Sequence, residues 1–257
     1  MKFGKKPFVA DERDLKLATY LDHTKLPKPP EAFGHADLVK DWGMLGNDTV
    51  GDCVFAGAAH ETLVLGAEGD HYPTFTDEAV LSDYSAVTGY VPGDASTDQG
   101  TDVREAVSYR RKTGMVDANG KRHHIGAFLY LEPGNFEQLR QALYLFGAAG
   151  IGYELPESAM QQFDQTKPWT VVDGSPIAGG HYVPAFGCEP GEYTDKGVNT
   201  FITSVSWGRV VPVTDSFYEK YCDEAVVYVS ASALGEDGKT PEGFDKAALL
   251  ADLKALA

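Results

Sequence analysis

The stretch Asn47-Asp-Thr-Val-Gly-Asp-Cys53-Val-Phe-Ala-Gly-Ala-Ala-His-Glu-Thr-Leu-Val-Leu-Gly-Ala67 decides how this chain folds. Small and apolar residues dominate it from Cys53 onward, which predicts a buried helix that begins at or just before Cys53. A thiol at a helix N-terminus lies beside unpaired amides and the positive end of the helix dipole, which favour the thiolate. We interpret Cys53 as a candidate nucleophile; the alternative is a packed small apolar residue.

A second feature is His181, in the run Gly179-Gly-His181-Tyr-Val-Pro-Ala-Phe-Gly187. A titratable side chain that opens an otherwise apolar strand needs a polar partner. Near Cys53 the sequence offers Asp48 and Asp52, and the charge of Asp52 would oppose ionisation of the thiol. A general base for Cys53 must therefore come from elsewhere in the fold, and His181 is the candidate.

The remaining patterns predict an α+β protein. Further helices are expected at residues 11–21, 76–88, 101–113, 135–149 and 244–256, and strands at 125–131, 150–155, 181–187, 199–207 and 224–230. We divide the chain into an N-terminal arm (1–41), a domain (42–230) with a mainly helical half (42–168) and a mainly β half (169–230), and a linker with a C-terminal helix (231–257).

Three blocks resemble the papain-like cysteine peptidases. Asn47-Asp-Thr-Val-Gly-Asp-Cys53-Val-Phe-Ala resembles the block of the nucleophile, and Gly180-His181-Tyr-Val-Pro-Ala-Phe-Gly187 resembles the strand of the base. Ser206-Trp207-Gly208 resembles an Asn-Ser-Trp-Gly block that follows them. The histidine lies about 130 residues beyond the cysteine, as in that family. The resemblance covers residues 42–230 and implies a papain-like fold, with the nucleophile helix packed against an antiparallel sheet.

The resemblance also implies roles for single residues. Cys53 would attack a peptide or isopeptide carbonyl, with His181 as base in an ion pair with the thiolate. Asn47, where the family has Gln, and the backbone N–H of Cys53 would form the oxyanion hole, and Trp207 would shield the imidazole from water. The resemblance implies a peptide or protein substrate and no cofactor.

One position departs from the family. Val205 stands where the family has the Asn that orients the imidazole, so Thr203, Ser204, Ser206 or a backbone carbonyl must replace it if activity is kept. The sequence therefore leaves two functions open beside the peptidase. One is a weakened or inactive module that binds an assembly through its arm or C-terminal helix, for example an accessory component of a bacteriophage virion. The other is related Cys-His chemistry, as in transglutaminase-like acyl transfer or amidase action on cell-wall peptides.

Composition narrows the partners and the location. The 257 residues carry 38 acidic and 22 basic side chains, a net charge of −16, so we expect no nucleic acid as a partner. No apolar run is long enough to span a bilayer and no signal peptide is evident, so we expect no membrane and a cytoplasmic location, with a virion as the alternative. The three cysteines lack CxxC spacing, and the His123-His124 pair and the Asp94, Asp98, Asp102 series lack metal-site spacing, so we expect no metal.

Overall fold

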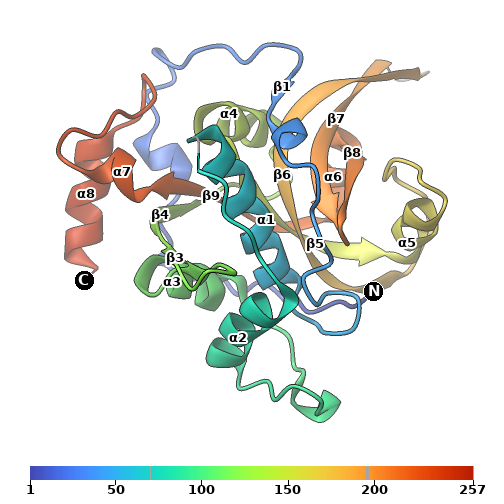
Figure 1. Ribbon diagram of the computed structural model, residues 1–257. Helices are drawn as coiled ribbons and strands as arrows, with labels where there is room; N and C mark the ends of the chain where they lie inside the picture. The colour runs from blue at the N-terminus through green and yellow to red at the C-terminus, as the bar shows by residue number, and fades with distance from the viewer. Residues whose placement is uncertain (70, 195–196, 257) are drawn as a thin grey trace.

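Helix α1, Cys53–Glu68, runs along one face of a large sheet (Figure 1). The helix begins at the predicted residue, which confirms that expectation. Its small side chains let it approach strand β6 closely. A Cβ atom added to Gly57 would lie 2.6 Å from the ring of Tyr182, so a larger residue here would push the helix off the sheet.

The computed structural model describes residues 1–69, 71–194 and 197–256. Its large sheet is antiparallel, with strands in the order β4-β9-β5-β6-β7-β8 and β1 paired to β6. The strands are β1 Phe33–Gly34, β4 Ile125–Tyr130, β5 Ala149–Pro156, β6 Ile177–Thr194, β7 Gly197–Ser206, β8 Arg209–Thr214 and β9 Cys222–Ser230. A small hairpin pairs β2 Met115–Val116 with β3 Arg122–His123.

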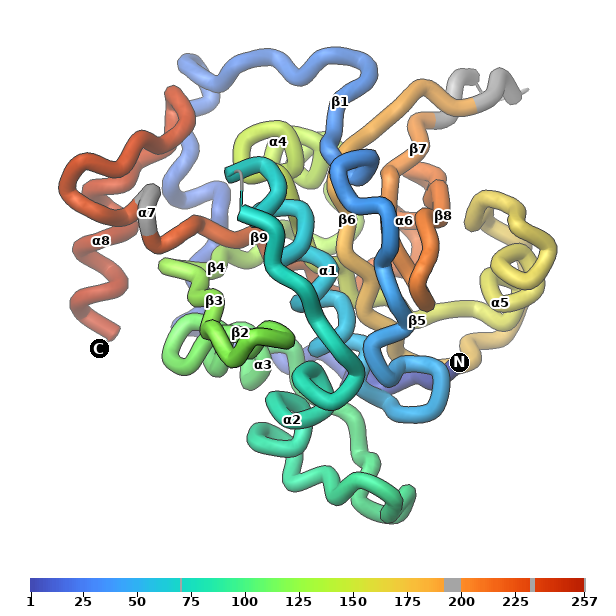
Figure 2. Tube along the Cα trace, in the orientation of Figure 1, coloured from blue at the N-terminus to red at the C-terminus, as the bar shows by residue number. Residues whose placement is uncertain are grey.

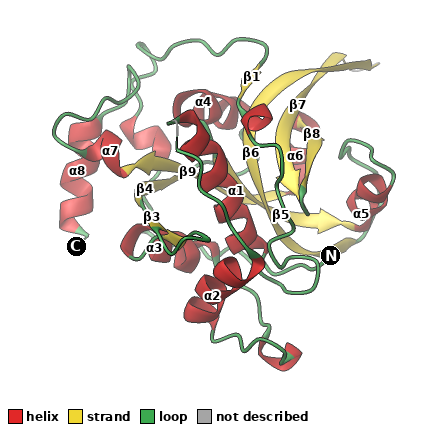
Figure 3. Ribbon diagram, viewed as in Figure 1, coloured by secondary structure: helices red, strands yellow, loops and turns green. Residues whose placement is uncertain are grey.

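Helices cover both faces of the sheet (Figure 3). The remaining helices are α2 Asp77–Thr88, α3 Val103–Lys112, α4 Phe136–Phe146, α5 Glu157–Asp164, α6 Asp215–Tyr221, α7 Ala231–Leu234 and α8 Lys246–Ala255, with 3-10 turns at Leu17–Tyr20, Ala36–Leu38 and Ala95–Thr97. Successive side chains along a strand point to opposite faces of the sheet, so they pack in two different core clusters. Tyr182 and Val226 pack on the side of α1, α2 and α3, whereas Val183 and Val227 pack on the side of α4 and α6.

Most predicted elements are confirmed. They could be predicted because capping residues and helix-ending residues mark their boundaries in the local sequence. Thr76 accepts a hydrogen bond from the N–H of Ala79 at the start of α2, and Asn135 accepts one from Gln138 at the start of α4. The α5, α6 and β8 segments were not expected. Within the described residues, no helix is long and apolar enough to cross a membrane.

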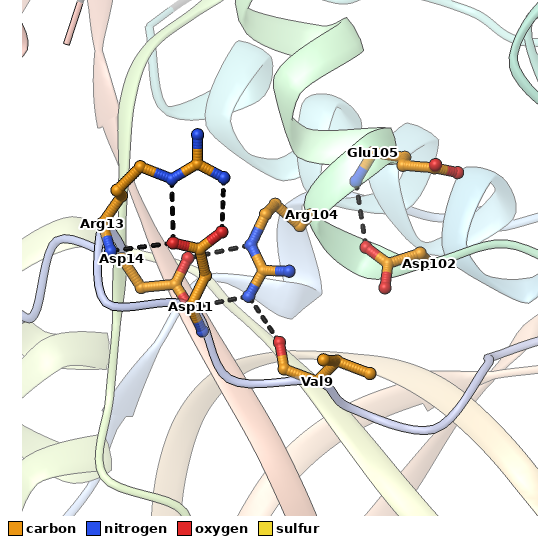
Figure 4. Close-up of polar contacts among 7 residues, drawn as sticks. All are labelled: Val9, Asp11, Arg13, Asp14, Asp102, Arg104 and Glu105. Atoms are coloured by element: carbon orange, nitrogen blue, oxygen red, sulfur yellow. Dashed lines mark hydrogen bonds and ion pairs between the residues drawn. The ribbon is translucent and has the colours of Figure 1, made fainter.

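The helix expected at residues 11–21 is wrong, since the segment forms only the 3-10 turn Leu17–Tyr20. Here side chains bond to the local backbone instead. Asp14 accepts the N–H of Asp11, and Asp11 accepts the N–H of Arg13. The Arg104 guanidinium on α3 also donates to both carboxylate oxygens of Asp14, at 2.8 and 2.6 Å, and to the Val9 carbonyl at 2.7 Å (Figure 4). A tertiary ion pair therefore fixes this stretch as an extended strap on α3.

Candidate active site

Cys53 is the first residue of α1 and is 1% exposed. Burial raises the pKa of its thiol to about 12, against the lowering effect of the Tyr182 and Gly4 backbone amides that face the sulfur. The thiol is therefore protonated at neutral pH in this structure. A helix N-terminus alone does not ionise a cysteine that water cannot reach.

Asp52 precedes the helix and is fully buried. Burial raises the pKa of its carboxyl well above the ordinary value, and the neighbouring Asn47 side chain opposes this shift only in part. Burial thus disfavours the charged form of this carboxyl. The Asp52 carboxylate still opposes ionisation of Cys53, as expected, since its charge raises the pKa of the thiol.

His181 lies on β6, 1% exposed, with its ring stacked on the Trp207 indole at a centroid distance of 4.2 Å. Its Nε2 atom is 2.8 Å from the Ser206 hydroxyl oxygen. Its Nδ1 atom is buried and has no hydrogen-bond partner in the described parts of the chain. Burial lowers the pKa of this imidazole to about 3, so the ring is neutral.

Strand β7 supplies the partner of the imidazole one residue later than the family pattern. Val205 packs in a core cluster with Trp42 and Phe186 and offers no polar atom. Of the hydroxyls considered from the sequence, Ser206 contacts His181, while the buried Ser204 hydroxyl has no partner among the described residues. For Thr203 no hydrogen bond to His181 is found within the described ranges.

A tight hairpin turn sets the orientation of Trp207. With Gly208 it forms the two-residue loop between β7 and β8, and both have positive φ, 44° and 73°. Such loops match the right-handed twist of the paired strands, although a positive φ is strained for tryptophan. The turn brings the indole over the imidazole.

Cys53 and His181 share one small cavity of about 10 Å³, which Asn47, Ser206 and Trp207 also line. The described residues include no hydrogen bond between the sulfur and the imidazole. Both groups are uncharged, unlike the thiolate–imidazolium pair that the resemblance implies, because the cavity has too little room for the water that would stabilise charge.

Asn47 lies beside this cavity with its amide already engaged. Its Nδ2 donates to the Val50 carbonyl at 3.0 Å and to the Lys2 carbonyl at 3.3 Å. The Trp207 Nε1 donates to the same Lys2 oxygen at 3.4 Å. A carbonyl of the chain's own N-terminus therefore occupies the donor that was predicted to bind an oxyanion.

The first six residues, Met1–Lys6, cover the site, and we call them the cleft segment. They pass the end of α1 that carries Cys53 (Figure 2). The N–H of Lys5 donates to the Gly180 carbonyl at 3.2 Å, and Thr101 exchanges backbone hydrogen bonds with Gly4 and Lys6. Phe3 packs edge-on against the rings of both His181 and Trp207.

Glycines make this close contact possible. A Cβ atom added to Gly4 would lie 1.6 Å from the Gly51 carbonyl oxygen, and one added to Gly180 would lie 2.2 Å from the Lys5 oxygen. No side chain fits at either contact. The sequence predicted an arm laid over the domain, yet nothing in its pattern placed the first six residues in the site, because the five Gly positions that line the contact are scattered along the chain, at Gly4, Gly51, Gly100, Gly179 and Gly180.

His60, which lines the same cavity, and His123 in the small hairpin have hydrogen-bond partners of their own. His60 on α1 is buried with its Nε2 2.9 Å from the Trp42 carbonyl oxygen. His123 pairs with Asp117 at 2.9 Å in the small hairpin. Across the described residues, no group of three His, Cys, Asp or Glu side chains is placed to hold a metal ion.

No protein-family model matches the chain, and no curated protein matches it in sequence. Solved structures do match. Xylellain, a cysteine protease from Xylella fastidiosa, aligns with a TM-score of 0.64 and 14% identity over 89% of this chain and 96% of that one. A procathepsin B from Trypanosoma congolense gives 0.62 and 11% over 89% and 86%, and the bromelain protease from Ananas comosus, solved with the inhibitor E64, gives 0.57 and 11% over 78% and 99%.

These likenesses show the fold. The chain has the predicted α+β papain-like fold, with a helix that starts at a cysteine packed against an antiparallel sheet. Nothing in them bears on a bacteriophage origin, which stays a prediction from the sequence.

Proposed function

We propose that this protein is a latent thiol hydrolase that cleaves peptide or isopeptide bonds through an acyl-enzyme on Cys53. The observation that carries the proposal is the shared cavity, which is lined by Cys53 at a helix N-terminus and by an imidazole whose Nε2 is held by Ser206. An imidazole with one nitrogen fixed and the other buried and unpaired is arranged to exchange a proton at the free atom.

Proton transfer runs through His181. With the ring hydrogen on Nε2 donated to Ser206 Oγ, Nδ1 accepts the proton of the Cys53 thiol. The sulfur attacks the carbonyl carbon, the C–N bond breaks, and the imidazolium returns the proton to the leaving amine. Water then attacks the thioester, gives a proton to His181 and releases the carboxylic acid, and the proton returns to the thiol.

Asn47 and Trp207 support this chemistry. Once Lys2 leaves, one N–H of the Asn47 amide is free to donate to the oxyanion of the tetrahedral intermediate, while the other still bonds to Val50. The Trp207 indole covers one face of the imidazole and keeps its orientation.

The cleft segment keeps the enzyme inactive. The backbone amide of Gly4 lowers the pKa of the Cys53 thiol, so the cleft segment lies against the sulfur. Displacing the segment admits water, and water lowers the pKa of the thiol and raises that of the imidazole toward their ordinary values. Activity therefore requires the segment to move.

The test uses the full chain with Gly4→Ala, because a Cβ here clashes with the Gly51 backbone and leaves every proposed catalytic side chain intact. Gly69→Ala is the matched control, since its nearest contact would be an ordinary 3.6 Å. We expect the Gly4→Ala chain to hydrolyse a fluorescently labelled unfolded protein much faster than the wild type or Gly69→Ala, and Cys53→Ala in the same background to abolish this.

The filled cavity also favours a second candidate, a papain-like module that binds a partner without catalysis. This candidate predicts that the Gly4→Ala chain stays inactive even when amide hydrogen exchange of Lys5 and Lys6 demonstrates that the cleft segment has left. That result would refute the hydrolase.

A further inference from the structure

Lys5 of the cleft segment occupies an acidic pocket next to the candidate dyad. Its side chain is 0% exposed, and its Nζ lies 2.7 Å from Asp223 Oδ2, 3.1 Å from Glu224 Oε1 and 3.0 Å from the Lys6 carbonyl oxygen. A fully buried lysine is rare unless paired, so this pocket is built for a cation.

The sheet provides the space for it. Gly152 on β5 lies directly opposite Glu224 on β9, and a Cβ at Gly152 would come within 2.1 Å of the Lys5 Cε. Because Gly152 has no side chain, its backbone forms the floor of the pocket, and the aliphatic stem of the lysine lies over it. Any larger residue at this position would close it.

The pocket adjoins the reacting groups. Lys5 donates its backbone N–H to Gly180, the residue before His181, and the neighbouring Gly4 faces the Cys53 sulfur. The Gly180 carbonyl and both backbone groups of Thr101 are main-chain partners that any extended peptide can use. A peptide that replaces the cleft segment therefore places a side chain over Gly152.

Charge decides which side chain is preferred. Glu224 is 3% exposed, and within the described chain no cation other than Lys5 lies within ion-pair distance of Glu224 or Asp223. When the segment leaves, a largely buried carboxylate loses its counter-charge, which costs free energy until another cation arrives or the group takes up a proton. Burial raises the pKa of Glu224 to about 7 even though the Lys5 ammonium lowers it.

We propose that Asp223, Glu224 and Gly152 form a specificity subsite that selects polypeptide substrates carrying a lysine side chain at this position. The inference rests on the proposed hydrolase, and it names the substrate class of the same site. Lys5 then holds the cleft closed by imitating the substrate side chain.

Two readouts keep this proposal apart from the hydrolase itself. The first needs no catalysis. In the full chain with Lys5→Ala, the pocket is no longer filled by the lysine atoms beyond Cβ. These atoms are three carbons and an ammonium group, which n-propylammonium reproduces. We expect n-propylammonium to raise the Tm of Lys5→Ala by more than equimolar NaCl does, and we expect n-propanol to have no such effect. The rise should disappear when Glu224→Gln, or Asp223→Asn at the partly exposed Asp223, is added. No rise in the Lys5→Ala chain would overturn the lysine pocket.

The second readout maps cleavage sites. The Gly4→Ala chain is given a mixture of unfolded proteins, and the products are identified by mass spectrometry. We expect lysine to be enriched about tenfold or more at one fixed position from the cleaved bond, and Glu224→Gln in the same background to reduce this enrichment. Hydrolysis with no lysine enrichment would refute the subsite and leave the hydrolase standing. If n-propylammonium raises the Tm of Lys5→Ala but the Gly4→Ala chain hydrolyses no protein, the pocket only anchors the cleft segment. That result would refute both the substrate assignment and the hydrolase.

Discussion

The Nε2 atom of His181 lies 2.8 Å from the Ser206 hydroxyl oxygen, one residue beyond the valine that occupies the expected asparagine position. A neutral hydroxyl orients the ring but adds no charge to stabilise an imidazolium. We predict that Ser206→Ala in the Gly4→Ala chain lowers kcat by about ten- to a hundredfold, less than the loss of a charged orienting group.

Ser204→Ala is the control for that change, because the Ser204 hydroxyl is equally buried and has no hydrogen-bond partner among the described residues. Its kcat should stay within about twofold of the parent, and its stability should not fall, since no hydrogen bond is lost. Equal losses in both variants would mean that Ser206 acts through packing alone.

Asn47 should have opposite effects in the closed and open chains. In the wild type, Asn47→Ala removes the hydrogen bond to Lys2 and should loosen the cleft segment, seen as faster hydrogen exchange at the Lys5 and Lys6 amides. In the Gly4→Ala chain the same change should lower kcat by about 10² to 10³, the usual loss for one oxyanion donor. An unchanged kcat would remove Asn47 from the oxyanion hole.

A buried ion pair joins α1 to α3. Arg110 pairs with Glu61, lies over the Tyr228 ring at 4.3 Å, and both charged side chains are almost fully buried. Arg110→Met should lower the free energy of unfolding by about 3–5 kcal/mol, because the Glu61 carboxylate keeps only the phenol hydrogen bonds of Tyr182 and Tyr228. Adding Glu61→Gln should recover part of the loss in a urea titration; no recovery would indicate a packing defect.

Acid should destabilise the protein through His60. Burial lowers its pKa to about 4 from 6.5, so the unfolded chain takes up a proton first as the pH falls, and the stability that the neutral ring contributes above pH 6.5 is lost between about 6.5 and 4. At pH 5 the loss is about 2 kcal/mol.

Buried carboxyls with raised pKa values, such as that of Asp52, act in the opposite direction, so the whole-protein trend does not isolate the histidine. The measurement is therefore the change in Tm between pH 7 and pH 5 in the wild type and in His60→Gln, whose amide can still donate to the Trp42 carbonyl. The fall on acidification should be smaller in His60→Gln, and an identical fall would contradict the assignment.

The fold was predictable from the sequence where its signals are local. Cys53 opens a run of small residues, and Thr76 and Asn135 stand at capping positions, so α1, α2 and α4 could be located without coordinates. Residues 11–21 have helical spacing, but the ion pair from Asp14 to Arg104 crosses ninety positions, and no local pattern reveals such a partner.

The residues of the candidate site were predictable from the sequence, but their protonation states were not. Three motif blocks locate Cys53, His181 and Trp207, which the fold brings together. The neutral form of the cysteine and histidine depends on burial under the cleft segment, and that contact joins residues far apart in the chain through glycines whose role is to have no side chain. For the same reason the Lys5 pocket, floored by Gly152, was invisible in the sequence.

The central claim, that the cleft segment seals a competent Cys53–His181 pair, is tested most directly by the rate at which iodoacetamide alkylates Cys53 at pH 7. The rate is followed by mass spectrometry of the peptide that contains this residue, in the wild type, Gly4→Ala and Gly69→Ala. We predict slow alkylation in the wild type and Gly69→Ala, a rate at least about tenfold higher in Gly4→Ala, and loss of that gain when His181→Ala is added. A Cys53 that stays unreactive in Gly4→Ala, while its Lys5 amide exchanges freely, would contradict the account.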